Sequence, residues 1–318
     1  MPRGLDTLAV VIGGPERLSL DRLALQSPAD GDLVVATEWS GISTGTERLL
    51  WSGKMPPFPG MGYPLVPGYE SVGRVVAVGR NAGARRVGER VFVPGARCYG
   101  EVRGLFGGAA SQLVVPATRV TPVDESLGER AVLLALAATA HHALLAAGDT
   151  PPELIVGHGV LGRLLARIAI ACGAAAPTVW ECDAARATGA VGYRVCVPGD
   201  DARRDYRSVC DVSGDPAILD PLISRLAPGG EVVLAGFYTE PLAFNFPPAF
   251  MREARLRVAA EWKDSDLAAV IRLLEDGRLS LDGLITHRRD AVAAEAAYRQ
   301  AFDDSGCLKM ILDWRQAA

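Results

Sequence analysis

The sequence predicts an α/β protein in which a β-rich module is followed by a doubly wound parallel sheet with helices on both faces. Three observations support this prediction. The first 122 residues contain short apolar runs broken by glycine and proline, without a helical period. From residue 131 onward, strand patterns alternate with helical patterns. A strand, a glycine-rich turn and a helix then follow one another between residues 153 and 173. The 318 residues are enough for two domains, each with its own core.

In the β-rich module we expect one hairpin and three further strands. The hairpin pairs Thr7–Ile12 with Leu18–Leu25. The further strands are Leu33–Thr37, Gly73–Val78 and Arg90–Val93. Residues 50–67 contain too many prolines for a regular element and are expected to form an apolar loop.

The run from Ala131 to Gly148 is 18 residues long and carries no charge, so it must be weighed as a membrane segment. It consists mostly of alanine, which partitions weakly into lipid, and it contains polar side chains at Thr139, His141 and His142. We therefore expect a buried helix between the domains and no integral membrane segment.

The glycine-rich turn lies between a short strand and an amphipathic helix. Leu154–Val156 has the apolar character of a buried strand, and apolar residues then recur at helical spacing up to Gly173. The turn, Gly157-His158-Gly159-Val160-Leu161-Gly162, has the G-x-G-x-x-G pattern. This order is the dinucleotide-binding start of a Rossmann unit, in which the helix N-terminus attracts the pyrophosphate. We assign all six turn residues to cofactor binding, with His158 either touching phosphate or facing solvent as a spacer.

A second strand, Thr178–Glu181, ends in an acid 24 residues after Gly157. A carboxylate at this place accepts hydrogen bonds from the ribose hydroxyls and repels a 2′-phosphate, so Glu181 indicates NAD rather than NADP. The alternative interpretation is a solvated acid at a strand end.

The remaining chain continues the alternation and then changes character. We expect strands at Val209–Val212, Glu231–Ala235, Leu284–Thr286 and Leu308–Leu312, and helices at Asp264–Gly277 and Ala291–Phe302. The domain prediction is a first domain of residues 1–122, completed by 264–318, and a Rossmann domain of residues 123–263. A tail that packs back on the β-rich module would leave a cleft between the two domains.

Composition excludes several classes of protein. A net charge of −4 gives no reason to expect nucleic acid as a partner. The six cysteines form no C-x-x-C pair, which indicates reduced thiols in a cytoplasmic protein. The N-terminus shows no signal-peptide pattern.

Several strings resemble the medium-chain dehydrogenase/reductase superfamily, among them residues 88–91, 226–233 and 284–288. The resemblance implies a GroES-like catalytic domain beside the Rossmann domain. Zinc-dependent members of the superfamily hold catalytic zinc with two cysteines and a histidine. At the matching positions this chain has Ser43, Tyr69 and Ala135. Because hydroxyl and methyl groups are poor zinc ligands, we expect no metal.

Longer strings, at residues 39–53, 94–108, 249–257 and 307–314, resemble one branch of that superfamily. The resemblance implies oxidation of the 3-(1-hydroxyethyl) group of a bacteriochlorophyllide, a tetrapyrrole, to 3-acetyl with NAD. This step belongs to bacteriochlorophyll a biosynthesis. The sequence leaves open whether the protein is a homodimer and whether it is located at the periphery of the photosynthetic membrane. The alternatives are a zinc-free quinone-type reductase that uses NADPH, and a pigment carrier or NAD sensor without turnover.

The candidate catalytic residues lie where zinc would be. Glu47 or Glu70 is the candidate base, Tyr69 a relay or hydrogen-bond donor, and Ser43 a relay residue or a small filler. For both acids the alternative is a structural role, in Glu47 as a turn-stabilising carboxylate.

Other sites follow from position and resemblance. Thr139 matches a nicotinamide contact, Arg186 a residue near the adenosine ribose, and Lys309 either a phosphate contact or an exposed strand lysine. Ser213, Gly236 and Phe237 follow strands at the sheet edge where such folds bind ligands. Trp51, Phe58 and Tyr63 offer flat apolar surface for the pigment, or belong to a loop packed on its own domain. His142 is a candidate base or ligand of the pigment's magnesium, or a packed helix residue.

Overall fold

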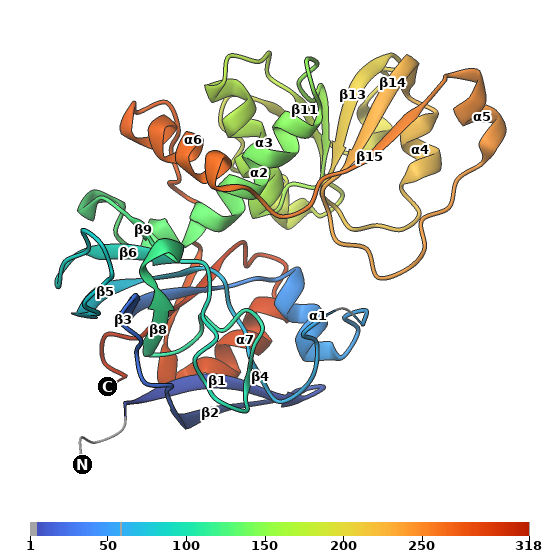
Figure 1. Ribbon diagram of the computed structural model, residues 1–318. Coiled ribbons are helices and arrows are strands. Elements are labelled where there is room, and N and C mark those ends of the chain that lie inside the picture. Colours follow the sequence, from blue (N-terminus) through green and yellow to red (C-terminus); the bar gives the residue numbers. More distant parts are fainter. Residues whose placement is uncertain (1–4, 58, 318) are drawn as a thin grey trace. The chain divides into compact units, whose positions relative to one another are not determined.

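A computed structural model describes residues 5–57 and 59–317 of the chain. The chain divides into two compact units, coloured along the sequence in Figure 1. Unit 1 consists of Met1–Leu134 and Leu284–Ala318, and unit 2 of Ala135–Gly283. The boundaries expected from the sequence were 122/123 and 263/264. The helix expected over Asp264–Gly277 therefore lies in unit 2 and is not part of the returning tail.

Unit 1 begins with the hairpin. Strands β1 (Asp6–Gly14) and β2 (Arg17–Ala24) pair antiparallel, which confirms that prediction. They join β4 (Leu65–Val66) and β7 (Arg103–Gly104) in a sheet of order β2-β1-β4-β7.

A larger sheet of unit 1 combines strands from both ends of the chain. Its order in the described residues is β16-β17-β3-β5-β6-β9, and β8 pairs with β3 beside this path. The strands are β16 (His287–Asp290), β17 (Met310–Asp313), β3 (Asp32–Ile42), β5 (Ser71–Val78), β6 (Arg90–Val93), β9 (Thr121–Pro122) and β8 (Gln112–Pro116). The strand expected over Leu284–Thr286 was wrong, because the strand of this region begins at His287.

Two helices of unit 1 differ in how well they were foreseen. The expected helix Ala291–Phe302 is present as the 3-10 turn η5 (Ala291–Ala293) followed by α7 (Ala294–Asp303). Helix α1 (Thr46–Ser52) was missed, because Glu47 was interpreted as a residue of a turn and residues 50–67 as a loop. It ends at Gly53, whose positive φ of 71° suits a residue without a side chain. Further 3-10 segments are η1 (Ala117–Arg119) and η2 (Glu125–Leu133).

Unit 2 is built on a six-stranded parallel sheet of order β12-β11-β10-β13-β14-β15. Its strands are β10 (Leu154–Val156), β11 (Thr178–Trp180), β12 (Arg194–Cys196), β13 (Tyr206–Asp211), β14 (Leu226–Leu234) and β15 (Arg255–Val258). Because the strand order reverses between β10 and β13, the crossover helices cover opposite faces of the sheet and ligands bind at the carboxyl ends of these two strands. The predicted fold class is thereby confirmed.

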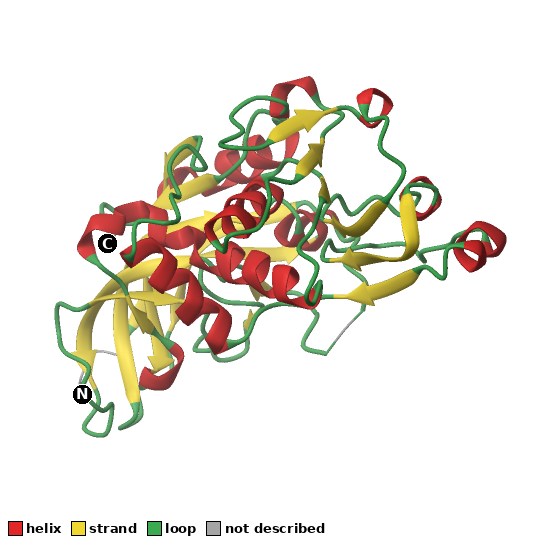
Figure 2. Ribbon diagram, turned by 90° about the horizontal axis from the view of Figure 1, so that it is seen from above, coloured by secondary structure: helices red, strands yellow, loops and turns green. Residues whose placement is uncertain are grey.

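The helices of unit 2 surround that sheet, as the red ribbons around the yellow strands in Figure 2 show. They are α2 (Leu134–Ala146), α3 (Val160–Ala171), α4 (Leu219–Ile223), α5 (Phe246–Met251) and α6 (Asp264–Glu275), with the 3-10 turns η3 (Ala184–Arg186) and η4 (Pro198–Asp200). Helix α2 accounts for the uncharged run, and most of its alanines are buried. Within the described residues, no helix is both long enough and apolar enough to cross a membrane.

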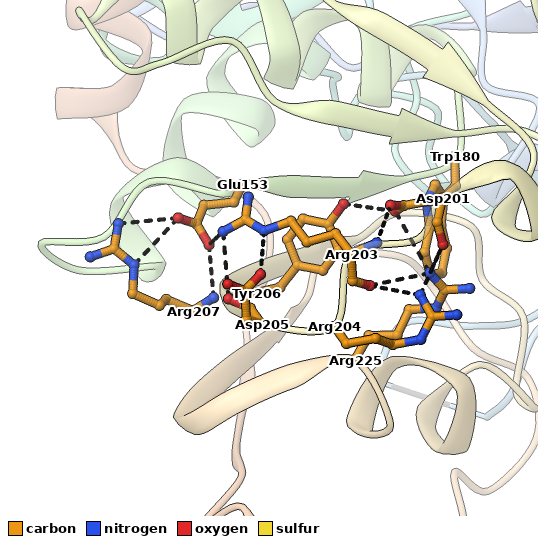
Figure 3. Close-up of polar contacts among 9 residues, drawn as sticks. All are labelled: Glu153, Trp180, Asp201, Arg203, Arg204, Asp205, Tyr206, Arg207 and Arg225. Carbon is orange, nitrogen blue, oxygen red and sulfur yellow. Dashed lines mark hydrogen bonds and ion pairs between the residues drawn. The ribbon is translucent and has the colours of Figure 1, made fainter.

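A polar network around Asp201 fixes one end of this sheet (Figure 3). Its carboxylate accepts bonds from Trp180 Nε1 on β11 at 2.8 Å and from the Tyr206 hydroxyl on β13 at 2.7 Å. The guanidinium groups of Arg225 and Arg203 lie over those two rings. Burial alone would raise the pKa of Asp201, but these hydrogen bonds outweigh it and lower the pKa. The network thus ties the two strands on either side of β10 to one loop.

Candidate functional site

The glycine turn has the geometry that a bound pyrophosphate needs. Gly157 has φ of +100°, and a Cβ on Gly162 would lie 1.9 Å from the Gly157 carbonyl oxygen. Gly159 instead has open space around its Cα. Helix α3 begins at Val160 without a side-chain cap among the described residues, so its first N–H groups are available to an anion.

Glu181 lies beside this turn, directly after β11. Its carboxylate accepts hydrogen bonds from His158 N at 3.0 Å and from Asp183 N at 2.8 Å. Both bonds fix the carboxylate at the end of the strand next to the glycine turn, the position expected for a ribose-binding acid.

His158 does not face solvent, so that interpretation was wrong. Its side chain is fully buried, with Nδ1 2.6 Å from the Arg186 carbonyl oxygen and Nε2 2.8 Å from the Tyr193 hydroxyl. Burial lowers the pKa of His158. The imidazole therefore connects the glycine turn to the loop after β11 and does not point toward a phosphate.

Arg163 is a residue of this site that the sequence analysis missed. Although it is charged, its side chain on α3 is almost completely buried. It donates hydrogen bonds to the backbone carbonyls of His158, Arg186 and Thr188. The loop that carries Arg186 is thus fastened to the glycine turn from two sides, by an imidazole and by a guanidinium group.

The loops after β10, β13 and β14 meet at one edge of the sheet. A Cβ on Gly157 would lie 3.4 Å from Ser213 Cα, and one on Gly236 3.0 Å from Gly214 N. The structure therefore brings these predicted cofactor residues together, with Phe237 exposed next to them. Beneath them lies the buried Asp211, which the sequence analysis also missed.

The carboxyl group of Asp211 accepts bonds from the hydroxyls of Ser213, at 2.7 Å, and of Tyr238. Burial raises the pKa of Asp211, while these bonds oppose the shift. Both the hydroxyl and the backbone N–H of Ser213 are consequently directed to Asp211 and not to a ligand.

The polar residues of helix α2 are held within unit 2. Thr139 donates its hydroxyl to the Ala135 carbonyl at 3.0 Å. His141 and His142 share one buried carboxylate, that of Asp266 on α6, at 2.8 and 2.9 Å from their Nδ1 atoms. The histidine predicted to meet the pigment therefore also fastens two helices together.

In unit 1, the two residues at the expected zinc-ligand positions contact each other. Ser43 Oγ lies 2.7 Å from the Tyr69 hydroxyl oxygen, and Tyr69 is also hydrogen-bonded to the Thr46 side chain. Burial, reinforced by the neighbouring Glu70 carboxylate, raises the pKa of Tyr69, so the phenol keeps its proton. The hydroxyl groups of Ser43, Thr46 and Tyr69 therefore form one connected group, the hydroxyl cluster.

Glu47 lies behind this hydroxyl cluster with no exposed surface. Its carboxyl group accepts a bond from Ser43 N at 3.1 Å and one from the Tyr298 hydroxyl at 2.6 Å. Burial raises the pKa of Glu47 to about 7. These contacts agree with the alternative role considered for Glu47, a carboxylate that stabilises the chain around Ser43.

Glu70 and Lys309 form a buried ion pair. Lys309 Nζ lies 2.6 and 2.9 Å from the two carboxylate oxygens of Glu70 and 3.1 Å from the Ile42 carbonyl oxygen. Burial raises the pKa of Glu70, and the ammonium group opposes that shift. All three donors of Lys309 have partners within unit 1, so the lysine is not an exposed strand residue.

The residues predicted to meet a planar pigment pack partly within unit 1. Trp51 lies against Phe302 with ring centroids 5.5 Å apart, and the Tyr63 hydroxyl donates to the Leu50 carbonyl. Both are half-buried. Phe58 lies outside the described residues. Their role toward a substrate stays a prediction.

The residues present do not suit a zinc ion. The Ser43 hydroxyl and the protonated Tyr69 phenol are bonded to each other, and Ala135 has no donor atom. Within the described part of the chain, no group of three or more histidine, cysteine, aspartate or glutamate side chains is placed to hold a metal ion.

Known proteins share this architecture. Residues 29–125 match the alcohol dehydrogenase GroES-like domain family. The solved structure of an alcohol dehydrogenase from Escherichia coli complexed with NADH has a TM-score of 0.84 at 22% identity, covering 98% of this chain and 100% of that one. The chain thus has the fold of a dinucleotide-binding dehydrogenase with a GroES-like domain.

Two relatives define its branch. The 2-desacetyl-2-hydroxyethyl bacteriochlorophyllide A dehydrogenase of Rhodobacter capsulatus is 57% identical over 314 residues, 98% of this chain and 100% of that protein. The protein of the same name from Cereibacter sphaeroides is 57% identical over 317 residues, 98% and 99% of the two chains. The chain belongs to this family of bacteriochlorophyllide dehydrogenases, which confirms the resemblance of its sequence strings.

The buried Glu47 predicts a pH dependence of stability. A carboxyl group whose pKa rises from 4.5 to about 7 on folding stabilises the folded state below pH 4.5, and this contribution is lost as pH rises through 7. Glu47→Gln removes the dependence. The free energy of unfolding of the unmodified protein should therefore fall relative to E47Q between pH 5 and pH 8, by about 3 kcal/mol at most.

Urea denaturation at both pH values measures this difference. Glu101→Gln, at an exposed acid of the same unit, is the matched control and should follow the unmodified protein. Parallel pH profiles for E47Q and the unmodified protein would show that Glu47 titrates as an ordinary surface acid.

Proposed function

We propose that the protein oxidises the 3-(1-hydroxyethyl) group of a bacteriochlorophyllide to a 3-acetyl group, a step of bacteriochlorophyll a biosynthesis. The observation that carries the proposal is 57% identity, over 98% of this chain, to the two dehydrogenases named for that substrate. The fold supports it, because the reaction needs a dinucleotide-binding domain and a hydroxyl-binding site.

The reaction removes a hydride from the carbinol carbon and a proton from its oxygen. NAD, when bound, accepts the hydride. The carbinol carbon is attached to a conjugated macrocycle, which delocalises the positive charge that develops as the hydride leaves. The protein must then bind the oxygen and conduct its proton to water.

The hydroxyl cluster of unit 1 suits that task. We assign the substrate oxygen to Tyr69 and Ser43, whose hydroxyls are 2.7 Å apart. Because the raised pKa keeps the Tyr69 phenol protonated, it serves as a hydrogen-bond donor and passes a proton along, rather than acting as a phenolate base. The proton leaves along Ser43, Tyr69 and Thr46.

The two acids then act as positioning residues. Glu47 has no exposed surface, and Glu70 is neutralised by Lys309. The Glu47 carboxyl group is bonded to the Ser43 backbone and that of Glu70 to Lys309, so neither is assigned the role of the base. Lys309 is therefore proposed to pair with Glu70 and not to contact a phosphate of the cofactor.

Zinc has no part in the proposed reaction, since the hydroxyls of Ser43 and Tyr69 already satisfy each other. The test is to strip the purified protein with a chelator, mix it with NAD and 3-hydroxyethyl bacteriochlorophyllide a, and follow the red absorption band. We expect the band to shift to that of the acetyl product at an unchanged rate.

Two outcomes contradict this proposal separately. Folded, NAD-binding protein that leaves the spectrum unchanged would disprove the substrate. Activity that is lost on chelation and restored by zinc would disprove the metal-free reaction.

NAD is the proposed acceptor because the Glu181 carboxylate is fixed by two backbone N–H groups at the end of β11. A 2′-phosphate at this position would meet a negative charge. Glu181→Gln removes the charge and keeps an acceptor oxygen. The ratio of kcat/KM for NAD to that for NADP should fall by about tenfold or more.

Glu153→Gln, at the start of β10, is the matched control and should leave the ratio unchanged. The same ratio in E181Q and the unmodified protein would assign the cofactor preference to other residues. None of the six cysteines, all of which the structure describes, forms a disulfide bond, which supports a cytoplasmic location as part of this proposal.

A homodimer is the proposed assembly. Strand β15 ends the parallel sheet, pairs only with β14 among the described strands and is exposed along its length. Exposed apolar side chains lie on this strand and beside it, and all of them except Val258 line a cavity of about 460 Å³. They are Phe244, Phe246, Phe250, Met251, Leu256 and Val258. An apolar surface beside an open strand edge favours association with a second copy.

Val258→Lys should disrupt that association, because it places two ammonium groups in the contact. Light scattering should give a dimer for the unmodified protein and a monomer for V258K. Val87→Lys, at an equally exposed apolar residue of unit 1, should remain dimeric. A monomeric unmodified protein would contradict the proposed assembly.

A further inference from the structure

The returning segment of unit 1 places two buried polar side chains behind the hydroxyl cluster. Tyr298 comes from α7, and Lys309 directly precedes β17. Each is only 1% exposed. Tyr298 donates to Glu47 and Lys309 to Glu70, and these acids are close in sequence to Ser43 and Tyr69.

The link through Glu47 is the more direct one. One carboxylate oxygen accepts from Tyr298 at 2.6 Å, and the other accepts from Ser43 N at 3.1 Å. A single carboxyl group therefore bridges helix α7 to the backbone of a residue in the hydroxyl cluster. The Tyr298 phenol stays protonated, because burial raises its pKa, so it is the donor in this bridge.

The same stretch of backbone is held from the other side. Ser43 O accepts from Glu47 N at 3.0 Å, and the Ile42 carbonyl accepts from Lys309 Nζ at 3.1 Å. With both its N–H and its C=O bonded, Ser43 has a fixed backbone, and the direction of its hydroxyl is set by that backbone. The close fit extends to Gly41, where a Cβ would lie 2.1 Å from a carboxylate oxygen of Glu70.

We propose that Tyr298 is a positioning residue for the oxidation: through Glu47 it fixes the Ser43 backbone and, with it, the pair of hydroxyls that binds the substrate oxygen. This inference rests on the proposed function, which assigns the oxygen to Ser43 and Tyr69. Nothing in the sequence connects Tyr298 with this role, since it lies 251 residues from Glu47.

The hydroxyl group carries the effect, while the ring supplies packing. The Tyr298 ring meets Phe302 edge to face, with centroids 5.7 Å apart. Tyr298→Phe keeps this contact and removes only the bond to Glu47. A matched control is Tyr206→Phe in unit 2, where a fully buried tyrosine also donates to a carboxylate, that of Asp201, at 2.7 Å.

The first readout is the reaction itself. For Y298F we expect kcat with the pigment to fall by about 10- to 100-fold, because a displaced hydroxyl pair binds the reacting oxygen less well. The affinity for NAD, measured by titration, should not change. Protonation of Glu47 weakens the bond that it accepts from Ser43 N and should lower kcat at acid pH. Because the Tyr298 bond lowers the pKa of Glu47, this acid limb of the kcat profile should move to higher pH in Y298F. Y206F should change neither kcat nor this limb.

The second readout is a double-mutant cycle. If Tyr298 acts through Glu47, Y298F should have little further effect on kcat in a Glu47→Leu background, which has no acceptor oxygen for the Tyr298 hydroxyl. Additive effects of the two substitutions, or a Y298F enzyme with unchanged kcat and pH profile, would overturn the proposal. An unmodified protein that does not convert the pigment would instead contradict the proposed function, and the two failures are therefore distinguishable.

The cycle can also be measured without turnover, by urea denaturation at pH 5 and pH 8. A coupled pair should show a smaller effect of Y298F in E47L than in the unmodified protein. Equal effects in both backgrounds would separate Tyr298 from Glu47 even if Y298F folded poorly under assay conditions.

Discussion

Two carboxyl groups without exposed surface, Glu47 and Glu70, set the constraint on which unit 1 depends. A buried carboxyl group is costly unless it is hydrogen-bonded or paired with a cation. The partners of both acids come from the last part of the chain, as a phenol from Tyr298 and an ammonium group from Lys309. The chain must therefore return to unit 1 after it has formed the parallel sheet. The discontinuity of unit 1 is a consequence of these two buried acids as well as of the pairing of β17 with β3.

In unit 2 the buried and half-buried polar side chains near the glycine turn are bonded mainly to backbone N–H and C=O groups. The close approach at Gly162 leaves no room for a side chain, and the loop after β11 must lie next to the turn for Glu181 to reach the N–H of His158. Arg163 and His158 achieve this by binding carbonyl oxygens of that loop. The side chains of Arg163 and His158 thus hold the loop against the turn, and the Glu181 carboxylate is held in place by two backbone N–H groups.

Much of the fold could be predicted because its information is local. The apolar runs at Arg90–Val93 and Leu154–Val156 gave strands with the bounds that the structure has. The hairpin and the glycine turn could also be predicted, because strand alternation and positive φ depend on residues that are near in the sequence. Helix α1 was missed because the prolines after it dominated the interpretation of that stretch, and the strand near residue 284 was placed too early.

The candidate site was only half predictable, for a physical reason. Ser43, Glu47, Tyr69 and Glu70 stand out because they replace or adjoin the residues that related enzymes use for zinc. Their partners Tyr298 and Lys309 lie 251 and 239 residues away and occupy a helix and a strand of ordinary pattern. His158 was misjudged because a histidine between two glycines has no local feature that indicates burial. Contacts of this kind are decided by tertiary packing, which no window of the sequence contains.

In the proposed metal-free reaction, hydroxyl groups stand where the zinc-dependent enzymes have thiolate and imidazole, and this changes what the surrounding protein has to supply. A metal centre fixes its ligands by coordination and stabilises an alkoxide by charge. A pair of hydroxyls does neither, so their orientation must come from neighbouring bonds and their protonation state from burial. The contacts of Ser43 supply the orientation, and the raised pKa of Tyr69 keeps a donor in place. The buried acids and the returning segment are then the structural counterpart of a coordination shell, organised around hydrogen bonds.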